Sequence, residues 1–336
     1  MTDLYAFGIG LASTDAAGNV LDCFFPAPLK TPAPALAGLI REHFAPGTTA
    51  VDAATVARFV EACGDNTPAS LREVLEADRP LTSVRLDTDG PIGSVAEAYL
   101  KLHLLSHRLA LPNSQNLDGI FAHLPNVAWT SDGPLGVSDL PAARIRARID
   151  GRPLEVYSVD KFPKMTNYVV PSGVRIADAS RVRLGAYLGE GTTVMPEGQI
   201  NFNAGAIGPS MVEGRISQGV IVGAHSDLGG GCSTMGTLSG GGEIVISIGE
   251  HCLIGANGGT GIPLGDRCTI AAGVYITAGT PVVVIDEHGE EIGRVKAREL
   301  AGASDLLFIQ NGSNGRIECR TNRKAIALNE QLHAHN

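Results

Sequence analysis

The strongest constraint in this sequence is an aliphatic residue that recurs every six positions between about residues 170 and 282. The series slips in phase several times but resumes at the same interval. A period of six fits neither an α-helix nor the two-residue alternation of a plain strand. It is typical of a hexapeptide β-solenoid, whose stacked coils bury apolar surface that one coil could not hide. The series comprises Val170, Ile176, Val182, Leu188, Val194, Ile200, Ala206, Ile216, Val222, Leu228, Ile248, Ile254, Leu264, Ile270, Ile276 and Val282.

Glycine is the unusual part of the composition, with 42 residues, while aromatic residues make up only 5%. Several of the recurrent aliphatics are followed directly by Gly, as in Leu188-Gly189 and Val222-Gly223. We expect the aliphatic side chain to point into the coil and the small residue to permit the turn between strands. The run "GGGCSTMGTLSGGGEIV", residues 229–245, interrupts the repeat. It predicts a plain loop, a protruding hairpin or a place where the backbone approaches a ligand closely.

The segments outside the repeat predict four parts. Residues 1–110 read as an N-terminal α/β domain, with helical spacing in "TVARFVEACG" and "SVAEAYLKLHLLSHRLAL". Residues 111–170 connect this domain to the coil of residues 171–283. Residues 284–336 form a C-terminal extension, in which "DEHGEEIGRVKARELAG" predicts a polar turn followed by a short helix and "SDLLFIQNGSNGRIECRTN" predicts a closing hairpin.

Charge and cysteine content exclude several classes of protein. A net charge of -9 without a dense Lys/Arg block argues against nucleic acid as a partner. The absence of a long apolar run and of a basic leader predicts a cytoplasmic protein without a membrane segment. The six cysteines show neither a CxxC pair nor a disulfide framework, so we expect idle thiols.

Several motifs resemble one family. They are "VDKFPKM", "YVVPSGVRIADASRVRLGAYLGEGTTVM", "NFNAG", "SMVEGRIS", "GGGCSTMGTLSGGG", "GANGGTGIPLGD", "YITAGT" and "KARELAG". Together they resemble the long form of tetrahydrodipicolinate N-succinyltransferase, from about residue 95 to the end. The resemblance implies a left-handed parallel β-helix in a homotrimer, with active sites between neighbouring coils. It also implies transfer of succinyl from succinyl-CoA to the amino group of 2-amino-6-oxopimelate, in lysine and diaminopimelate biosynthesis.

The same resemblance assigns site residues. Transfer from a thioester to an amine needs a base for the proton on nitrogen and donors for the oxyanion. The acid of the "MVEGR" motif is Glu213, as general base or acyl carrier, and Arg215 contacts a carboxylate or the donor. Gly236 is a backbone position at the reacting centre. The CoA groove is implied at Gly230, Ser233, Ala256, Ala271, Ala272, Gly279 and Lys296. Taken without the resemblance, Glu213 also fits a solvated corner of the repeat, and Lys296 a solvated surface.

Some positions depart from the family pattern. Actinobacterial members hold magnesium at the trimer axis with an Asp and a Glu; here Ser180 replaces the Asp and only Glu197 remains. We therefore predict no required metal, since the carboxylates left at such an axis would hold a cation weakly. Further departures stand at Pro196, Gln199, Ala271, Ile309 and Gln310. They leave open a paralogue that acylates a related amino acid in secondary metabolism, with acetyl-CoA as the alternative donor.

Functions of other classes fit the sequence less well. A γ-type carbonic anhydrase needs three zinc histidines, and the coil offers only His225 and His251. A non-catalytic solenoid would show regular Thr rows and no Gly-rich excursion. The helical pair His103 and His107 could bind metal only with a third ligand.

Overall fold

The computed structural model describes residues 4–64, 69–74, 76, 81–237 and 244–321. The chain divides into two compact units. The first comprises Met1–Ala110, Ser114–Pro163 and Asn167–Val169, and the second contains the remaining segments, chiefly Val170–Asn336. Residues 114–163 thus lie in the N-terminal unit, whereas the four-part division made from the sequence stays a prediction.

The first unit is a layered α/β structure. Its main sheet has the order β2-β1-β5-β4, with β3 also paired to β1, and all of these pairs are antiparallel. Phe7 and Ile9 of β1 belong to the buried cluster that includes side chains of α1 and α2. The alternate residue Gly8 faces Phe25 and Leu100 of α4, at 2.6 and 2.9 Å from where a Cβ would lie. The two faces of β1 therefore contact different layers, as a two-residue period requires.

A small antiparallel sheet, β7-β6-β8, completes this unit. Its strand β8 lies in the segment "EVYSVDKF" that leads toward the coil. The elements of the unit are β1 (Ala6–Thr14), β2 (Val20–Phe24), β3 (Leu29–Lys30), α1 (Pro34–His43), β4 (Gly47–Val51), α2 (Ala53–Cys63), α3 (Ala69–Val74), β5 (Leu81–Leu86), α4 (Val95–Ser106), α5 (Ile120–His123), β6 (Val127–Thr130), β7 (Gly133–Gly136), α6 (Leu140–Ile149) and β8 (Val156–Asp160).

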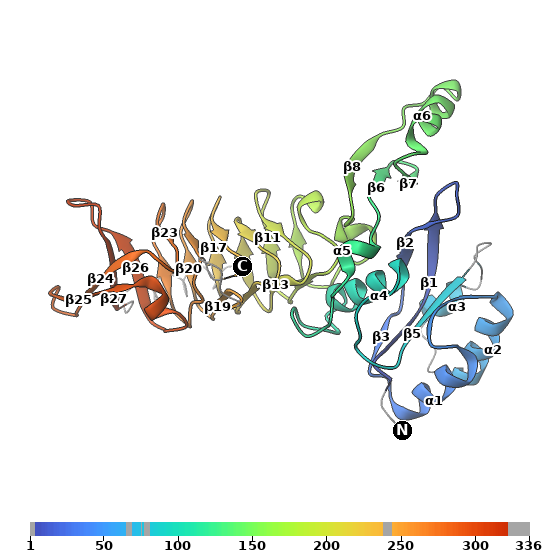
Figure 1. The fold of residues 1–336 in the computed structure, drawn as a ribbon, viewed down its shortest axis with the longest axis horizontal. Helices are drawn as coiled ribbons and strands as arrows, with labels where there is room; N and C mark the ends of the chain where they lie inside the picture. Colours follow the sequence, from blue (N-terminus) through green and yellow to red (C-terminus); the bar gives the residue numbers. More distant parts are fainter. Residues whose placement is uncertain (1–3, 65–68, 75, 77–80, 238–243, 322–336) are drawn as a thin grey trace. The chain divides into compact units, whose positions relative to one another are not determined.

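The second unit is a left-handed parallel β-helix, as the six-residue period and the resemblance predicted (Figure 1). Each turn of the chain visits three faces. Face 1 holds β9 (Arg175–Ile176), β11 (Thr192–Val194), β14 (Ser210–Val212), β17 (Asp227–Leu228), β20 (Leu253–Ile254) and β22 (Thr269–Ile270). Face 2 holds β12 (Gln199–Ile200), β15 (Arg215–Ile216), β18 (Ser233–Thr234), β21 (Gly259–Thr260) and β23 (Tyr275–Ile276). Face 3 holds β10 (Ala186–Leu188), β13 (Ala204–Ala206), β16 (Ile221–Val222) and β19 (Ser247–Ile248).

The recurrent aliphatics form the interior of the coil. Ile200 and Ile216 stack in register on face 2, and both are buried. One member of the predicted series is wrong, because the side chain of Val170 is 69% exposed and lies ahead of the first coil. The C-terminal part of the series, through Val282, is buried as expected.

The glycines after the aliphatics have a different role from the one predicted. A Cβ on Gly189 would lie 2.4 Å from the carbonyl of Ile207, and one on Gly223 would lie 2.6 Å from Gly249. Neither residue has a positive φ. Glycine is needed there because the next coil approaches too closely for a side chain. The left-handed turns are instead made by polar residues such as Asn203 and His225, at φ 53° and 60°, and by other glycines such as Gly191 and Gly231, at φ 81° and 69°.

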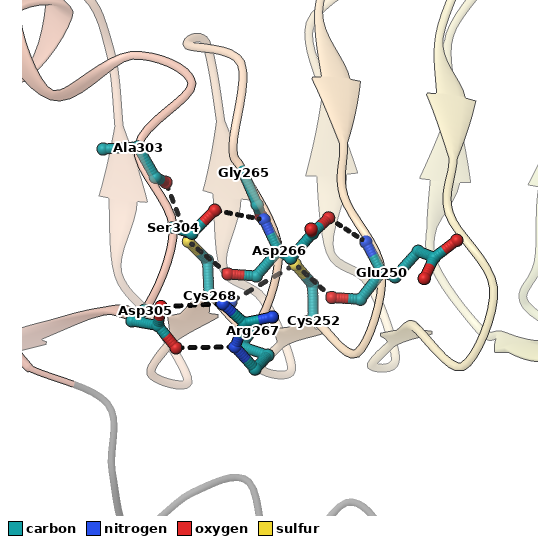
Figure 2. A network of polar contacts seen from close by, with 9 residues as sticks. All are labelled: Glu250, Cys252, Gly265, Asp266, Arg267, Cys268, Ala303, Ser304 and Asp305. Carbon is teal, nitrogen blue, oxygen red and sulfur yellow. Dashed lines mark hydrogen bonds and ion pairs between the residues drawn. The ribbon is translucent and has the colours of Figure 1, made fainter.

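The corner between face 3 and face 1 is held by a column of hydroxyl and thiol groups. Figure 2 shows its C-terminal part, where the Cys252 thiol donates to the carbonyl of Gly265 and the Cys268 thiol to that of Ala303. The Cys252 sulfur also accepts from the Cys268 amide, at 3.3 Å. All six cysteines are free, as predicted, but these two cap backbone groups and are therefore not idle.

The C-terminal extension closes the coil with antiparallel strands. Strands β26 (Leu306–Gln310) and β27 (Ile317–Thr321) form the predicted hairpin, and β26 continues face 1 beside β22. A second hairpin joins β24 (Pro281–Ile285) to β25 (Glu291–Lys296). Residues 291–296, expected to be turn or helix, are thus a strand. Among the residues that the structure describes, none of the helices combines the length and apolarity needed to cross a membrane.

Candidate active site

Glu213 lies in a shortened corner of the coil. Two residues, Glu213 and Gly214, join β14 to β15, whereas four join β11 to β12 (195–198) and four join β17 to β18 (229–232). The strands on both sides nevertheless stay in register with their neighbours. The phase slip in the repeat therefore produces a notch in the edge between faces 1 and 2, and Glu213 is at its base.

The floor of the notch is a buried thiol. Cys232 is fully buried, and a Cβ on Gly214 would lie 2.2 Å from its sulfur and 2.7 Å from its carbonyl oxygen. Burial raises the pKa of Cys232 to about 12; Arg215 opposes this rise and Glu213 adds to it. A thiol that stays protonated near neutral pH is a poor nucleophile. The thiol supports the notch and leaves Glu213 as the reactive group there.

Two carboxylates converge above the notch. Glu213 is half-buried and Glu197, one coil earlier, is exposed. Their Oε2 atoms lie 3.6 and 3.5 Å from the point that a Cβ on Gly230 would occupy. Gly230 thus leaves an open space between the acids of two successive coils. The Glu213 side chain accepts no hydrogen bond from any described residue, so its oxygens are available to a substrate.

Arg215 begins an outward-facing row on face 2. The register aligns Gln199, Arg215, Ser233, Gly259 and Tyr275 across successive coils. Arg215 is exposed, and within the described residues its guanidinium forms no ion pair. The Tyr275 ring covers Gly259, where a Cβ would come within 2.3 Å of it. The row forms a polar track along the coil that starts beside Glu213.

The other predicted positions fall into two groups. The edge between faces 1 and 2 carries Glu197, Glu213, Gly230, Ala256, Ala271 and Ala272. The opposite edge of face 2 carries Gly236, Gly279 and Lys296. The structure brings the members of each group together but leaves the groups on opposite edges of face 2 within one chain.

Gly236 marks this separation. A Cβ on Gly236 would lie 3.2 Å from the carbonyl oxygen of Gln218, which is five residues beyond Glu213. At about 3.3 Å per extended residue, Gln218 lies up to roughly 16 Å from Glu213, and Gly236 lies beside Gln218. Gly236 also opens the excursion, since its carbonyl accepts from Ile246 and Thr237 pairs antiparallel with Val245. The interruption begins there and not at residue 229, because 229–234 form a regular corner and β18. Residues 238–243 lie outside the described part.

Three departures from the family pattern, Ala271, Ile309 and Gln310, lie near the C-terminal end of the coil, whereas Pro196 and Gln199 lie beside Glu197 and in β12. The Ala271 backbone amide donates to the carbonyl of Phe308, so Ala271 and Ile309 are neighbours. The side-chain amide of Gln310 donates to the carbonyl of Gly315 and ties the β26–β27 hairpin. Along face 1, Ala271 is three coil steps from Glu213, or about 14 Å, and β26 is one step farther, or about 19 Å.

The histidines that the structure describes do not form a metal site. His103 is fully buried, with Nδ1 at 2.7 Å from the Tyr99 carbonyl and Nε2 at 3.3 Å from the Phe25 amide. Burial lowers the pKa of His103 to about 3. His225 and His251 stack with ring centroids 5.0 Å apart. Across the described residues no group of three or more His, Cys, Asp or Glu side chains is arranged to hold a metal. At the predicted axis, the Ser180 hydroxyl donates to Asp178 and Glu197 contributes one carboxylate, a poor set of ligands.

Sequence reasoning missed Gly214 and Cys232, which shape the notch, and the pair Gly259 and Tyr275 in the polar track on face 2. For Gly214, the sequence did contain a signal, namely the phase slip in the repeat. Continuing the count from Ala206 reaches Val212, which is buried, so the slip lies within the four-residue step from Val212 to Ile216. The contact of Cys232 with Gly214 has no local sequence signature.

The chain is similar to known proteins over nearly its whole length. The family model described as "Tetrahydrodipicolinate N-succinyltransferase middle" matches residues 124–164, and "Hexapeptide repeat of succinyl-transferase" matches residues 245–278. The chain is 54% identical to 2,3,4,5-tetrahydropyridine-2,6-dicarboxylate N-succinyltransferase of Pseudomonas putida, over 99% of both chains. It is 52% identical to the protein of that name from Vibrio cholerae, again over 99% of both.

A solved structure is also similar over nearly the whole chain. It is a 2,3,4,5-tetrahydropyridine-2-carboxylate N-succinyltransferase from Campylobacter jejuni, 33% identical, with a TM-score of 0.88. The match covers 97% of this chain and 94% of the other.

Proposed function

Because this chain belongs to the 2,3,4,5-tetrahydropyridine-2,6-dicarboxylate N-succinyltransferase family, we propose that the notch at Glu213 is the place where it transfers succinyl to an amino group. The chain is an acyltransferase of diaminopimelate and lysine biosynthesis, and its donor is an acyl-CoA. The names of its relatives support this pathway over the secondary-metabolism alternative. The proposal for the site rests on the shortened corner. This corner places the carboxylate of Glu213, which forms no ion pair with a described residue, between the longer corners of the two neighbouring coils.

The reaction joins an amine to a thioester. The amino nitrogen attacks the thioester carbonyl, a C–N bond forms, the C–S bond breaks, and the nitrogen loses a proton. Glu213 takes that proton as general base, because its oxygens face the open space at Gly230 and accept no bond from a described residue. Cys232 remains protonated beneath it, so no acyl-cysteine is formed.

Arg215 orients a carboxylate of the substrate. It lies two residues from Glu213 at the start of the polar track, and its fork can bind a carboxylate through two hydrogen bonds. The acceptor, 2-amino-6-oxopimelate, carries a carboxylate beside its reacting amine. Arg215 therefore fixes this group while Glu213 meets the amine.

Succinyl-CoA is the donor in this proposal. Within one chain, Ala271 lies about 14 Å from Glu213, and Ile309 and Gln310 lie about 19 Å from it, so none of them contacts an acyl group at Glu213 of the same chain. A site that pairs the terminal carboxylate of succinyl disfavours acetyl-CoA, because its own polar groups would be left unpaired. No metal takes part in these steps.

The active protein is a homotrimer in this proposal. Gly236 and Glu213 lie on opposite edges of face 2, so one chain by itself does not assemble both in one site. A neighbouring copy that places its Gly236 edge against the Glu213 edge completes the site. Light scattering should then give a molar mass equal to that of three chains, and a fully active monomer would contradict this arrangement.

The experiment that tests the site is Glu213→Gln, with Glu197→Gln as matched control on the preceding coil. We expect Glu213→Gln to lower turnover by about two to four orders of magnitude, the range for a lost general base, with an unchanged thermal midpoint. Turnover is measured with succinyl-CoA and acetyl-CoA, using 2-aminopimelate as acceptor. A thermal midpoint that falls in step with turnover would assign Glu213 a structural role.

A further inference from the structure

A three-residue segment from the first half of the chain belongs to the coil. Leu111–Asn113 is part of the second unit, whereas the chain on either side of it belongs to the first. Its last residue, Asn113, is exposed and has a left-handed backbone, at φ 64°. Asparagine adopts this conformation more readily than most residues. Asn113 therefore meets the coil from a part of the sequence that lies outside the six-residue repeat.

Asn113 completes a column of hydrogen bonds at the corner between faces 2 and 3. The Asn203 amide donates to the carbonyl of Gly185, and the Gly219 amide to the carbonyl of Asn203, at 2.8 and 2.9 Å. All three of these corner residues have a positive φ. In the next coil, the excursion between β18 and β19 stands where this corner would be. The side-chain amide of Asn113 donates to the carbonyl of Gly219 in its place, at 2.7 Å.

Asn113 also forms a reciprocal pair with Asn203. The backbone amide of Asn113 donates to Oδ1 of Asn203 at 2.7 Å, and Nδ2 of Asn203 donates to Oδ1 of Asn113 at 3.0 Å. The backbone N–H, the Oδ1 and the Nδ2 of Asn113 are thus all bonded to the same corner of the coil. Such a connected set of hydrogen bonds fixes both the side chain and the corner in one arrangement.

The corner that Asn113 holds is bonded to the strand that leads into the excursion. The Ser217 hydroxyl donates to the carbonyl of Thr234 at 2.6 Å, and the Ser217 amide donates to the Thr234 hydroxyl at 3.0 Å. Two residues farther along, a Cβ on Gly236 would lie 3.2 Å from the carbonyl oxygen of Gln218. The backbone of Gly236 therefore lies directly against residues 217–219.

The same corner contacts the point where the excursion rejoins the coil. A Cβ on Gly219 would lie 3.3 Å from Val245 and 3.5 Å from Oδ1 of Asn113. The next residue, Ile246, donates its amide to the carbonyl of Gly236 at 3.2 Å. A shift of the corner at Gly219 would therefore move both ends of the excursion, and Gly236 with them.

The position of Gly236 matters because its backbone N–H is available to a substrate. Among the described residues, no acceptor receives a hydrogen bond from the Gly236 amide. A free backbone N–H at a reacting centre can hold a developing oxyanion. Such a donor acts only when it is placed accurately, and a displacement of about 1 Å can cost about a hundredfold in rate.

We propose that Asn113 is a positioning residue for the acyl transfer. It fixes the corner of residues 217–219, and through this corner it holds the backbone of Gly236 in the place that the reacting centre requires. Asn113 itself touches neither substrate. The inference rests on the proposed function, because Gly236 is a site residue only in that proposal.

The test removes the Asn113 side chain without straining its backbone. Asn113→Gly does this, since glycine adopts a φ of 64° freely. Asn113→Asp keeps the size of the side chain but places an oxygen against the carbonyl of Gly219, so that hydrogen bond is lost. Thr31→Gly is the matched control, because it removes an exposed side chain at a positive φ, 46°, in the other unit.

We expect both Asn113 variants to lower kcat by about tenfold to a hundredfold, with KM for succinyl-CoA and for 2-aminopimelate within about twofold. Thr31→Gly should leave kcat and both KM values unchanged. A merely structural role of Asn113 would lower the thermal midpoint and leave the kcat of the folded protein unchanged. That result would overturn the proposal.

A double-mutant cycle tests whether Asn113 acts through Gly236. In Gly236→Ala the backbone at that position is already displaced, because the added methyl group lies 3.2 Å from the Gln218 carbonyl. Adding Asn113→Gly to this variant should then lower kcat by less than about twofold. If the two effects multiplied in full, the route through Gly236 would be overturned.

Backbone hydrogen exchange separates this proposal from the proposed function. In Asn113→Gly, amides of residues 217–222 and 235–237 should exchange faster, while residues 253–285 at the far end of the coil keep their rates. Unchanged exchange in 217–222 would overturn the proposal at any turnover. Faster exchange there, together with wild-type turnover in Gly236→Ala, would overturn the catalytic role of Gly236 and with it the role of Asn113 in the reaction.

Discussion

Gly214→Ala should damage both the fold and the reaction, because the added methyl group has no room. Its Cβ would lie 2.2 Å from the sulfur of Cys232, 2.7 Å from its oxygen and 3.1 Å from its carbonyl carbon. Ordinary contacts at a Cβ begin near 3.4 Å, so the two coils must separate locally by about 1 Å. The Arg215 amide, which donates to the Cys232 carbonyl at 2.8 Å, opposes this movement.

Overpacking of this kind costs about 1–3 kcal/mol. For a unit of this size, a loss of about 2 kcal/mol lowers the thermal midpoint by about 4–8 °C. Because Glu213 directly precedes the displaced residue 214, its carboxylate should also move, and turnover should fall at least tenfold. The assays are thermal unfolding by circular dichroism and turnover of succinyl-CoA.

Gly312→Ala is the matched control, since no atom lies within 4 Å of the position its Cβ would take. It should change the free energy of unfolding by less than about 0.5 kcal/mol. The double variant Gly214→Ala, Cys232→Ala should recover part of the loss, because it removes the sulfur but not the carbonyl. If Gly214→Ala kept wild-type stability and turnover, the close packing of Cys232 against residue 214 would be refuted.

Two further predictions concern the open space and the buried histidine. Gly230→Ala places a methyl group at ordinary contact distance from the carboxylates of Glu197 and Glu213. The thermal midpoint should stay unchanged, while turnover should fall about tenfold. Unchanged turnover would show that the substrate does not use the space beside Gly230. The pKa of His103 is about 3 in the folded protein and 6.5 ordinarily, so between these pH values the unfolded chain binds one more proton than the folded chain. The free energy of unfolding therefore decreases as the pH is lowered through this window. In urea unfolding between pH 6 and 4.5, this dependence on pH should be weaker in His103→Gln than in wild type by up to about 1.4 kcal/mol per pH unit, and equal slopes would contradict a buried neutral imidazole.

Much of the coil could be predicted because its signal is local and repeated. Most inward aliphatics, such as Val194 or Ile248, are followed six residues later by another, and this spacing is visible without any knowledge of contacts. Helices α2 and α4 and the β26–β27 hairpin were likewise readable from short-range patterns. The exposed Val170 shows the limit, since the period does not say where stacking begins.

The site was readable only in part. The motif around Glu213 identified the acid through its resemblance to a family, and the assigned roles remain predictions. Gly230 opens a space beside Glu213 and Glu197, which lie 17 and 33 positions earlier in the chain, so this arrangement depends on contacts between distant residues. The pairing of β24 with β25 and β27 was not predicted, because residues 291–296 were expected to be turn or helix.

The sequence by itself determined that the chain would coil, because a six-residue aliphatic period admits one kind of stacked structure. It also determined that a carboxylate and a guanidinium would stand two residues apart. Only the tertiary structure decided that the corner between them is two residues shorter than its neighbours and that Cys232 supports it from below. The physical reason is that a notch is a difference between stacked corners, and such a difference exists only once the coils are in register.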